Sequence, residues 1–139
     1  MHSRAVMDTN VLYAGLRSRH GASFEILEAL WQGRWTLLLS NTVLTEYEEI
    51  LTREAAVLRL SPARIHRLLD ALCALAEQRH PSGAWTPILA DPGDEAFAQL
   101  AVEAEAGHLV SHNLSHLAPA RRLGVNLLAP RDFLAILRA

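Results

Sequence analysis

The chain has 139 residues, of which 50% are hydrophobic and 20% are charged. This length and composition are typical of one globular domain that buries a core without disulfides or structural metals. The formal net charge of −2 lacks the basic excess that most nucleic-acid-binding proteins show. All 13 basic residues are arginine, which binds phosphate well. A biased genomic base composition explains the absence of lysine equally well.

No apolar run approaches the length of a bilayer span, and the first residues, MHSRAVMDTN, contain no signal-peptide hydrophobic region. We therefore expect a cytoplasmic protein without a membrane partner. The single cysteine, Cys73, lies at a core position of a predicted helix. It excludes a disulfide framework and a cysteine-rich zinc site, and we interpret it as a packing residue.

The first half of the chain alternates between short apolar runs and amphipathic stretches. Residues 4–8 (RAVMD) and 35–40 (WTLLLS) predict buried strands. Apolar residues at helical spacing predict helices between and after these strands. The predicted helices cover residues 9–18, 22–33, 41–58 and 61–80, the last with Ser61 as N-cap and Pro62 at its first position.

The second half continues the alternation. Residues 85–89 (WTPIL) predict a weak strand, placed at a sheet edge because of Pro87. A capped helix over residues 91–107, strands over 108–111 and 125–129, and a helix over 130–139 follow.

Strands that alternate with helices of these lengths predict an α/β fold. Right-handed crossovers then give a parallel sheet between two layers of helices. Neither a repeat, a low-complexity segment nor a linker interrupts the chain, so we expect residues 1–139 to form a single domain. In such open sheets the functional crevice lies beyond the carboxyl ends of the strands.

Acidic residues occur where the predicted strands end and the next helices begin. Asp8 follows the first strand, Glu46 lies early in the helix after the second, and Asp94 lies in the DPGDE stretch before an inner strand. The aspartates have structural alternatives: Asp8 and Asp91, the first residue of DPGDE, are good N-caps, and Asp94 suits the first turn of a helix. Glu48 and Glu49 are interpreted as an ordinary solvated helix face.

Together, however, three carboxylates at one sheet edge would repel one another unless a cation lay between them. Oxygen ligands without cysteine or paired histidine favour Mg²⁺ or Mn²⁺, which also bridge to substrate phosphates. Metal-assisted hydrolysis of a phosphodiester is the reaction that such a site suits.

The motifs VMDTNVL, LSNTVLTEYEEIL and DPGDEAFAQLAVEAEAGHLVSHNLSHL, followed by GVNLLAPRDFL, resemble a PIN domain. The resemblance covers essentially the whole chain and is strongest to the branch that includes toxins of toxin/antitoxin pairs. It implies a three-layer, Rossmann-like PIN fold, a Mg²⁺ or Mn²⁺ site and endonuclease activity on single-stranded or structured RNA. An antitoxin partner and a homodimer are also implied.

Carried over to this sequence, the metal-binding acids of the family are Asp8, Glu46 and Asp94. Asn113 occupies the place of a fourth acid, in a turn that reads Ser111, His112, Asn113. An asparagine oxygen can still bind a cation or hold its water, but the loss of one negative charge should weaken a second metal most. Two further polar residues that match positions orienting the acids are Asn10 and Ser40.

His108, His112 and His116 recur every four residues like zinc ligands. That spacing faces one direction only on a helix, whereas these residues precede a strand, end it and follow a turn, so we expect their side chains to diverge. His112 and His116 remain candidates for phosphate contacts or pH-sensitive groups, beside a structural hydrogen-bonding role. Arg17 and Arg19 are candidates for phosphate contacts at the rim.

Two other functions stay open. Because Asn113 replaces an acid, the chain could be a degenerate PIN-like module that binds RNA or a protein partner without cleavage. A nucleotide-binding Rossmann-like domain is disfavoured, because the first predicted strand is followed by DTNVLYAG rather than a glycine-rich phosphate loop.

Overall fold

Five parallel strands form one sheet in the order β3–β2–β1–β4–β5. The computed structural model describes residues 2–105 and 107–139. Ala5 of the central strand pairs with Leu37 on one side and with His108 on the other. The strands are β1 (Arg4–Met7), β2 (Thr36–Leu39), β3 (Glu77–Gln78), β4 (His108–Val110) and β5 (Asn126–Leu128).

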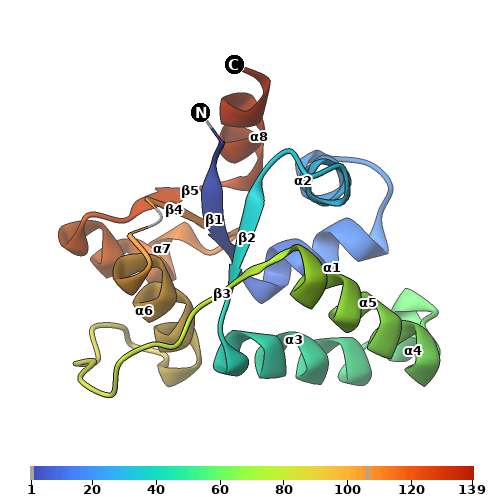
Figure 1. Cartoon of the computed structure of the whole chain (residues 1–139), viewed down its shortest axis with the longest axis horizontal. Coiled ribbons are helices and arrows are strands. Elements are labelled where there is room, and N and C mark those ends of the chain that lie inside the picture. Colours follow the sequence, from blue (N-terminus) through green and yellow to red (C-terminus); the bar gives the residue numbers. More distant parts are fainter. Residues whose placement is uncertain (1, 106) are drawn as a thin grey trace.

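Helices cover both faces of this sheet (Figure 1). In that view α1 and α2 lie to one side of β1 and β2, and α6 and α7 lie to the other. The expected helix–sheet–helix sandwich is therefore confirmed. The helices are α1 (Thr9–Arg17), α2 (Ala22–Trp31), α3 (Asn41–Arg53), α4 (Ala55–Leu58), α5 (Pro62–Leu75), α6 (Glu95–Glu103), α7 (Leu114–Leu117) and α8 (Pro130–Arg138), with 3₁₀ turns η1 (Pro92–Asp94) and η2 (Ala118–Leu123).

The central strands are buried on both faces, which explains their continuous apolar sequences. The buried Tyr47 of α3 donates its hydroxyl hydrogen bond to the carbonyl oxygen of Met7, so α3 is fixed against the carboxyl end of β1. Helix α3 begins after Ser40, whose side chain accepts a hydrogen bond from the N–H of Val43. None of the described helices has both the length and the hydropathy of a membrane span.

The predicted strand at residues 85–89 is wrong. The edge strand is instead β3, formed by residues that the helical pattern assigned to the helix over 61–80, which ends at Leu75. Tertiary contacts explain the difference, because the N–H groups of Ile88 and Leu89 bind the carboxylate of Glu95 instead of a neighbouring strand. Pro87 has no N–H to offer a sheet.

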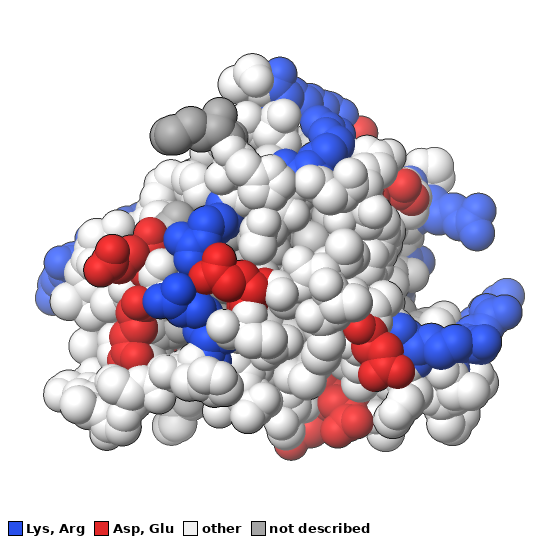
Figure 2. All heavy atoms as spheres, in the orientation of Figure 1, with Lys and Arg blue, Asp and Glu red and all other residues white. Residues whose placement is uncertain are grey.

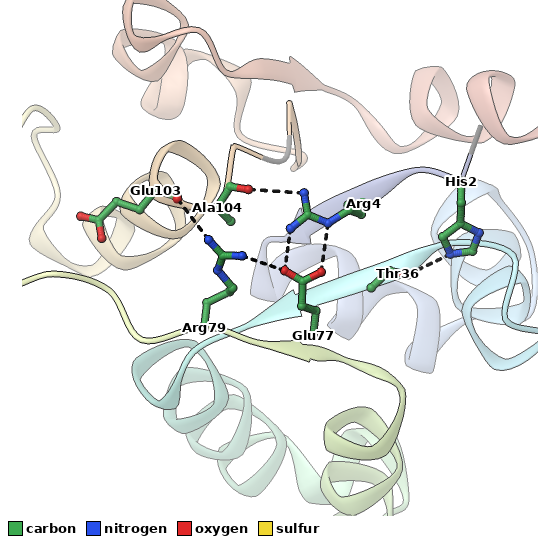
Figure 3. Close-up of polar contacts among 7 residues, drawn as sticks. All are labelled: His2, Arg4, Thr36, Glu77, Arg79, Glu103 and Ala104. Atoms are coloured by element: carbon green, nitrogen blue, oxygen red, sulfur yellow. Dashed lines mark hydrogen bonds and ion pairs between the residues drawn. The ribbon is translucent and has the colours of Figure 1, made fainter.

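Charged groups hold β3 at the sheet edge (Figure 3). Arg4 of β1 donates two hydrogen bonds to Glu77, of 3.0 and 2.6 Å, and Arg79 donates a third of 3.0 Å. The same arginines reach the carbonyl oxygens of Ala104 and Glu103 at the end of α6. The Arg4 guanidinium lowers the pKa of Glu77, which shows that the carboxylate form is favoured here.

Two predicted helix boundaries are also corrected. The helix expected over residues 41–58 breaks at Glu54 into α3 and α4, and the turn packs Ala55, Leu58 and Leu60 against the core. The helix expected over residues 91–107 begins as the 3₁₀ turn η1 and continues as α6. Its predicted end includes residue 106, which lies outside the described residues.

Candidate functional site

A cleft of about 430 Å³ opens at the carboxyl edge of the sheet. Its walls come from the start of α1, the exposed side of α3, the η1 turn and the loop after β4. Parallel strands all end at this edge, so residues far apart in sequence meet there. Among the residues that line the cleft are Asp8, Glu46, Asp94 and Asn113.

Asp8 lies at the floor of the cleft and is only 6% exposed. Its N–H donates to the carbonyl oxygen of Val110, which continues the pairing of β1 with β4. Asp8 is the N-cap residue of α1, but its side chain makes no capping hydrogen bond to that helix; it accepts one from the Ser111 hydroxyl instead. Burial raises the pKa of Asp8, and the Ser111 hydroxyl is the largest of several opposing contacts.

Ser111 connects the two loops that border the cleft. Its hydroxyl donates to Oδ2 of Asp8 at 2.6 Å and accepts hydrogen bonds from the N–H of Asn113 and from Nδ2 of Asn10. Asn10 also accepts a hydrogen bond from the backbone N–H of His112. Ser111 and Asn10 therefore fix the position of Asp8 and of the turn that carries Asn113.

Glu46 projects from α3 into the cleft and is half-buried. Burial raises its pKa, and the charge of Glu49 adds to this effect, whereas Arg53 opposes it. Glu49 is exposed, as expected for a solvated face, and it also lines the cleft. It lies three positions after Glu46, which is the helical spacing that places two side chains on one face.

Asp94 ends the η1 turn on the opposite wall. Burial raises its pKa, with further contributions from the negative charges of Asp8 and Asp91. Asp91 acts as the predicted N-cap, because its carboxylate accepts a hydrogen bond of 2.9 Å from the N–H of Gly93.

Glu95 organises the loop that precedes Asp94, a role that the sequence analysis missed. Its carboxylate accepts hydrogen bonds from the Trp85 indole (2.8 Å) and from the backbone N–H groups of Ile88 (2.8 Å) and Leu89 (2.6 Å). Burial would raise the pKa of Glu95, but these hydrogen bonds lower it. No local pattern signals this role, because the three donors are placed by the loop and not by a helix or strand.

The three histidines diverge, as expected. His108 lies against the Phe133 ring and beside Asn126, and His112 makes a hydrogen bond of 3.0 Å to Ser23. His116 lines a separate cavity next to Asp91. Neither His112 nor His116 is among the described residues that line the main cleft. Their charges lower the pKa of Asp8 and Asp94, respectively.

Comparison of the sequence with protein-family models gave a match of residues 4–115 to the family described as PIN domain. The chain belongs to the PIN-domain family. Its fold is similar to the crystal structure of VapBC2 from Rickettsia felis bound to a DNA fragment from their promoter, with a TM-score of 0.60 and 17% identity. The alignment covers 91% of this chain and 98% of that chain. A comparison with curated proteins gave no match.

The cleft of this PIN domain offers ligands that suit a hard divalent cation. Asp8, Glu46, Asp94 and Asn113 all supply oxygen atoms, which Mg²⁺ and Mn²⁺ prefer. Burial is the largest cause of the raised pKa of each carboxyl group, so bringing a positive charge into the cleft would stabilise the ionised forms. Within the described residues no three His, Cys, Asp or Glu side chains form a ready-made metal group. Mg²⁺ commonly retains several waters, which allows more distant carboxylates to share it.

Other predicted residues of the PIN domain lie elsewhere. Ser40 is the buried N-cap of α3 and does not belong to the cleft lining, and the Arg17 guanidinium lies over the Tyr13 ring. Two residues that the sequence analysis did not single out, Tyr13 and Arg53, line the cleft beside the acids. Helical spacing could have pointed to both residues. Tyr13 lies four positions after Thr9, and Arg53 lies seven positions after Glu46, and residues at such spacings lie on one face of a helix.

Proposed function

We propose that this PIN domain is a metal-dependent endoribonuclease in which Asp8, Glu46 and Asp94 bind Mg²⁺ or Mn²⁺. One observation carries the proposal: the three carboxylates and Asn113 come from four separate segments and line one cleft at the carboxyl edge of a parallel sheet. Each of the three carboxyl groups has a raised pKa, which is common where acids are gathered for binding or catalysis.

When bound, the cation would activate water, orient the scissile phosphate and offset negative charge in the transition state. The chain contributes the positions of the ligands. Ser111 holds Asp8, Tyr47 holds α3 and therefore Glu46 against β1, and Glu95 holds the loop before Asp94. In-line hydrolysis would break the bond between phosphorus and O3′ and leave a 5′-phosphate and a 3′-hydroxyl.

Asn113 is exposed, and it stands at the position where many of the PIN domains that the sequence resembles have a fourth acid. Its backbone N–H is fixed by Ser111, so the side chain starts from a defined position beside Asp8. With a neutral amide there, we propose that one cation is bound more tightly than a second.

We also propose that the protein is the toxin of a toxin/antitoxin pair in the cytoplasm and that it forms a homodimer. The PIN domains that the sequence resembles include such toxins, and the similar VapBC2 structure is bound to a fragment of promoter DNA. Co-purification of a small DNA-binding protein encoded beside this chain, with loss of RNA cleavage in the complex, would support this assignment. Light scattering of the purified chain would test the dimer.

A second candidate is a PIN-like module that binds RNA or a protein without cleavage. The exposed amide at Asn113 and the lack of a ready-made metal group among the described residues favour it. Metal affinity separates the two candidates, because a binding module does not need Mn²⁺ at Asp8 and Glu46.

Cleavage of end-labelled single-stranded RNA and transfer RNA in Mg²⁺ or Mn²⁺ tests the proposal directly. We expect discrete products that disappear with EDTA and with Asp8→Ala. Asp70→Ala, which removes an exposed aspartate from α5, is the matched control and should cleave normally. Products that persist unchanged with Asp8→Ala would contradict the proposal. A further variant, Asn113→Asp, should increase the affinity for a second cation.

A further inference from the structure

A second cavity, of about 330 Å³, borders the turn that carries Asn113. Its walls come from the end of α1, the starts of α2 and α8, and the turn after β4. Tyr13 and Asn113 line the acidic cleft, whereas their neighbours in sequence, Ala14 and His112, line this cavity. Among the described residues none lines both, so the two sites are neighbours with separate linings. The volume is in the range of sites that bind small molecules.

The basic side chains of this cavity come from three separate segments. His20 lies in the loop between α1 and α2, His112 lies in the turn after β4, and Arg131 lies in the first turn of α8. None of the described residues that line the cavity is acidic, although the chain has a net charge of −2. On the face drawn in Figure 2, by contrast, basic side chains stand next to acidic ones. The cavity therefore gathers basic groups without the acidic neighbours that basic groups have on that face.

The polar side chains of the cavity are partly fixed before any ligand binds. The buried Ser23 makes a hydrogen bond of 3.0 Å to Nε2 of His112, which holds the imidazole ring at the cavity wall. Arg131 is exposed and takes part in none of the salt bridges found in the part of the chain that the structure describes. Its guanidinium is therefore available to an anion, and its planar shape matches two phosphate oxygens at once.

Backbone donors add to these side chains. Helices α2 and α8 begin at this cavity after Gly21 and Ala129, and neither of these N-cap residues makes a side-chain cap. The first N–H groups of a helix have no partner within the helix and attract negative charge. Here two helix starts lie beside three basic side chains, which is a donor set that suits a phosphate group.

We propose that this cavity binds a phosphate dianion, either free in solution or carried by a small phosphorylated molecule. The Arg131 guanidinium would bind two phosphate oxygens, and His20, His112 and the helix N–H groups would bind the others. Small residues in the wall, Ala14 and Ala22, leave room for the group that carries the phosphate. The inference goes beyond the proposed ribonuclease function and does not depend on it, because the proposed metal ligands line the other site.

Isothermal titration calorimetry of inorganic phosphate into the metal-free protein, in EDTA, tests the inference. Without a cation the acidic cleft repels phosphate, so the heat of binding reports the cavity. We expect saturable binding that Arg131→Ala weakens about 10-fold, because a charged partner with two hydrogen bonds is lost. Arg122→Ala is the matched control, since it removes an exposed arginine of η2 outside the cavity and should bind phosphate like the unsubstituted protein.

The NMR signals of the histidine rings locate the bound phosphate. Phosphate should shift the signals of His20 and His112, which line the cavity. It should leave the signals of His66 and His80 in place, because these exposed histidines lie outside the cavity. Shifts confined to His66 and His80 would overturn the inference.

A comparison of adenosine 5′-monophosphate with adenosine separates the two sources of phosphate. Tighter binding of the monophosphate than of inorganic phosphate, without binding of adenosine, would support a phosphorylated molecule as the ligand. Equal affinities would support recognition of the phosphate group alone. The inference is overturned if neither phosphate nor the monophosphate binds, or if Arg131→Ala binds them as tightly as Arg122→Ala does. Each of these results leaves RNA cleavage untouched, so the ribonuclease proposal stands or fails separately.

Discussion

The Ser111 hydroxyl donates a hydrogen bond of 2.6 Å to Oδ2 of Asp8, which lies 103 positions earlier in the chain, and both residues are buried. The bond joins the ends of the two neighbouring strands β1 and β4 at the floor of the cleft. It gives Asp8 one orientation before any ligand arrives. A hydrogen bond to a buried charged group is among the stronger ones in proteins.

Removal of this hydroxyl should therefore weaken metal binding. We expect Ser111→Ala to lower the affinity for Mn²⁺ about 10- to 150-fold, because a hydrogen bond to a charged group contributes about 1.5–3 kcal/mol. Isothermal titration calorimetry measures the change. Ser115→Ala is the matched control, since it removes an exposed hydroxyl from α7. Equal affinities for Ser111→Ala and the unsubstituted protein would show that Asp8 does not depend on this contact.

The charge of Asp8 should cost stability in the metal-free protein. Burial raises the pKa of Asp8 above the unfolded value of about 4. The protonated Asp8 therefore favours the folded state: this stabilisation is fully present below that pH and is lost as the pH rises through the folded pKa. We expect Asp8→Asn to raise the melting temperature by a few degrees at pH 7 in EDTA, and the difference to disappear near pH 3.

Thermal unfolding of both proteins across this pH range checks the expectation. Added Mn²⁺ should stabilise the unsubstituted protein through binding to its folded state, and should stabilise Asp8→Asn much less. Asp70→Asn, on the exposed side of α5, should behave like the unsubstituted protein in both respects. A variant Asp8→Asn that melts below the unsubstituted protein at pH 7 would refute the sign of the effect.

Glu95 should control the order of the loop before Asp94. Glu95→Gln keeps the size of the side chain but removes the charge that attracts the N–H groups of Ile88 and Leu89. We expect amide hydrogen exchange at these two residues to be about 10-fold faster, because local opening becomes easier. Glu28→Gln on the exposed side of α2 is the control. Unchanged exchange at Ile88 and Leu89 would mean that other contacts hold the loop.

Gly15 allows α1 and α2 to approach closely. A Cβ atom at this position would lie 2.5 Å from Cδ1 of Leu27 and 2.8 Å from the carbonyl oxygen of Ser23. Alanine favours a helix by about 1 kcal/mol over glycine, yet we expect Gly15→Ala to destabilise the protein by about 1–3 kcal/mol, because the backbone oxygen must move.

Urea unfolding measures this difference. Ala135→Gly, at an exposed position of α8, makes the reverse exchange without the contact and reports the helix preference alone. A stabilised Gly15→Ala protein would show that the two helices can separate at no cost.

Much of the architecture could be predicted from local sequence. The buried strands before Asp8 and before Ser40, the cap at Ser61 and the helices that follow each strand are indicated by patterns of residues close together in the chain. Because parallel strands end at one edge, the approach of Asp8, Glu46 and Asp94 could also be predicted, and the structure places all three in one cleft. Their binding of a metal stays a prediction.

Only the tertiary structure decided which polar groups meet. The edge strand at Glu77 depends on Arg4, and the irregular segment at Ile88 depends on Glu95, so neither follows from hydrophobic periodicity. The contact of Ser111 with Asp8 likewise joins residues that no local pattern relates. Periodicity reports which face of an element is buried, whereas the partner of a buried polar group depends on elements brought together by the whole chain.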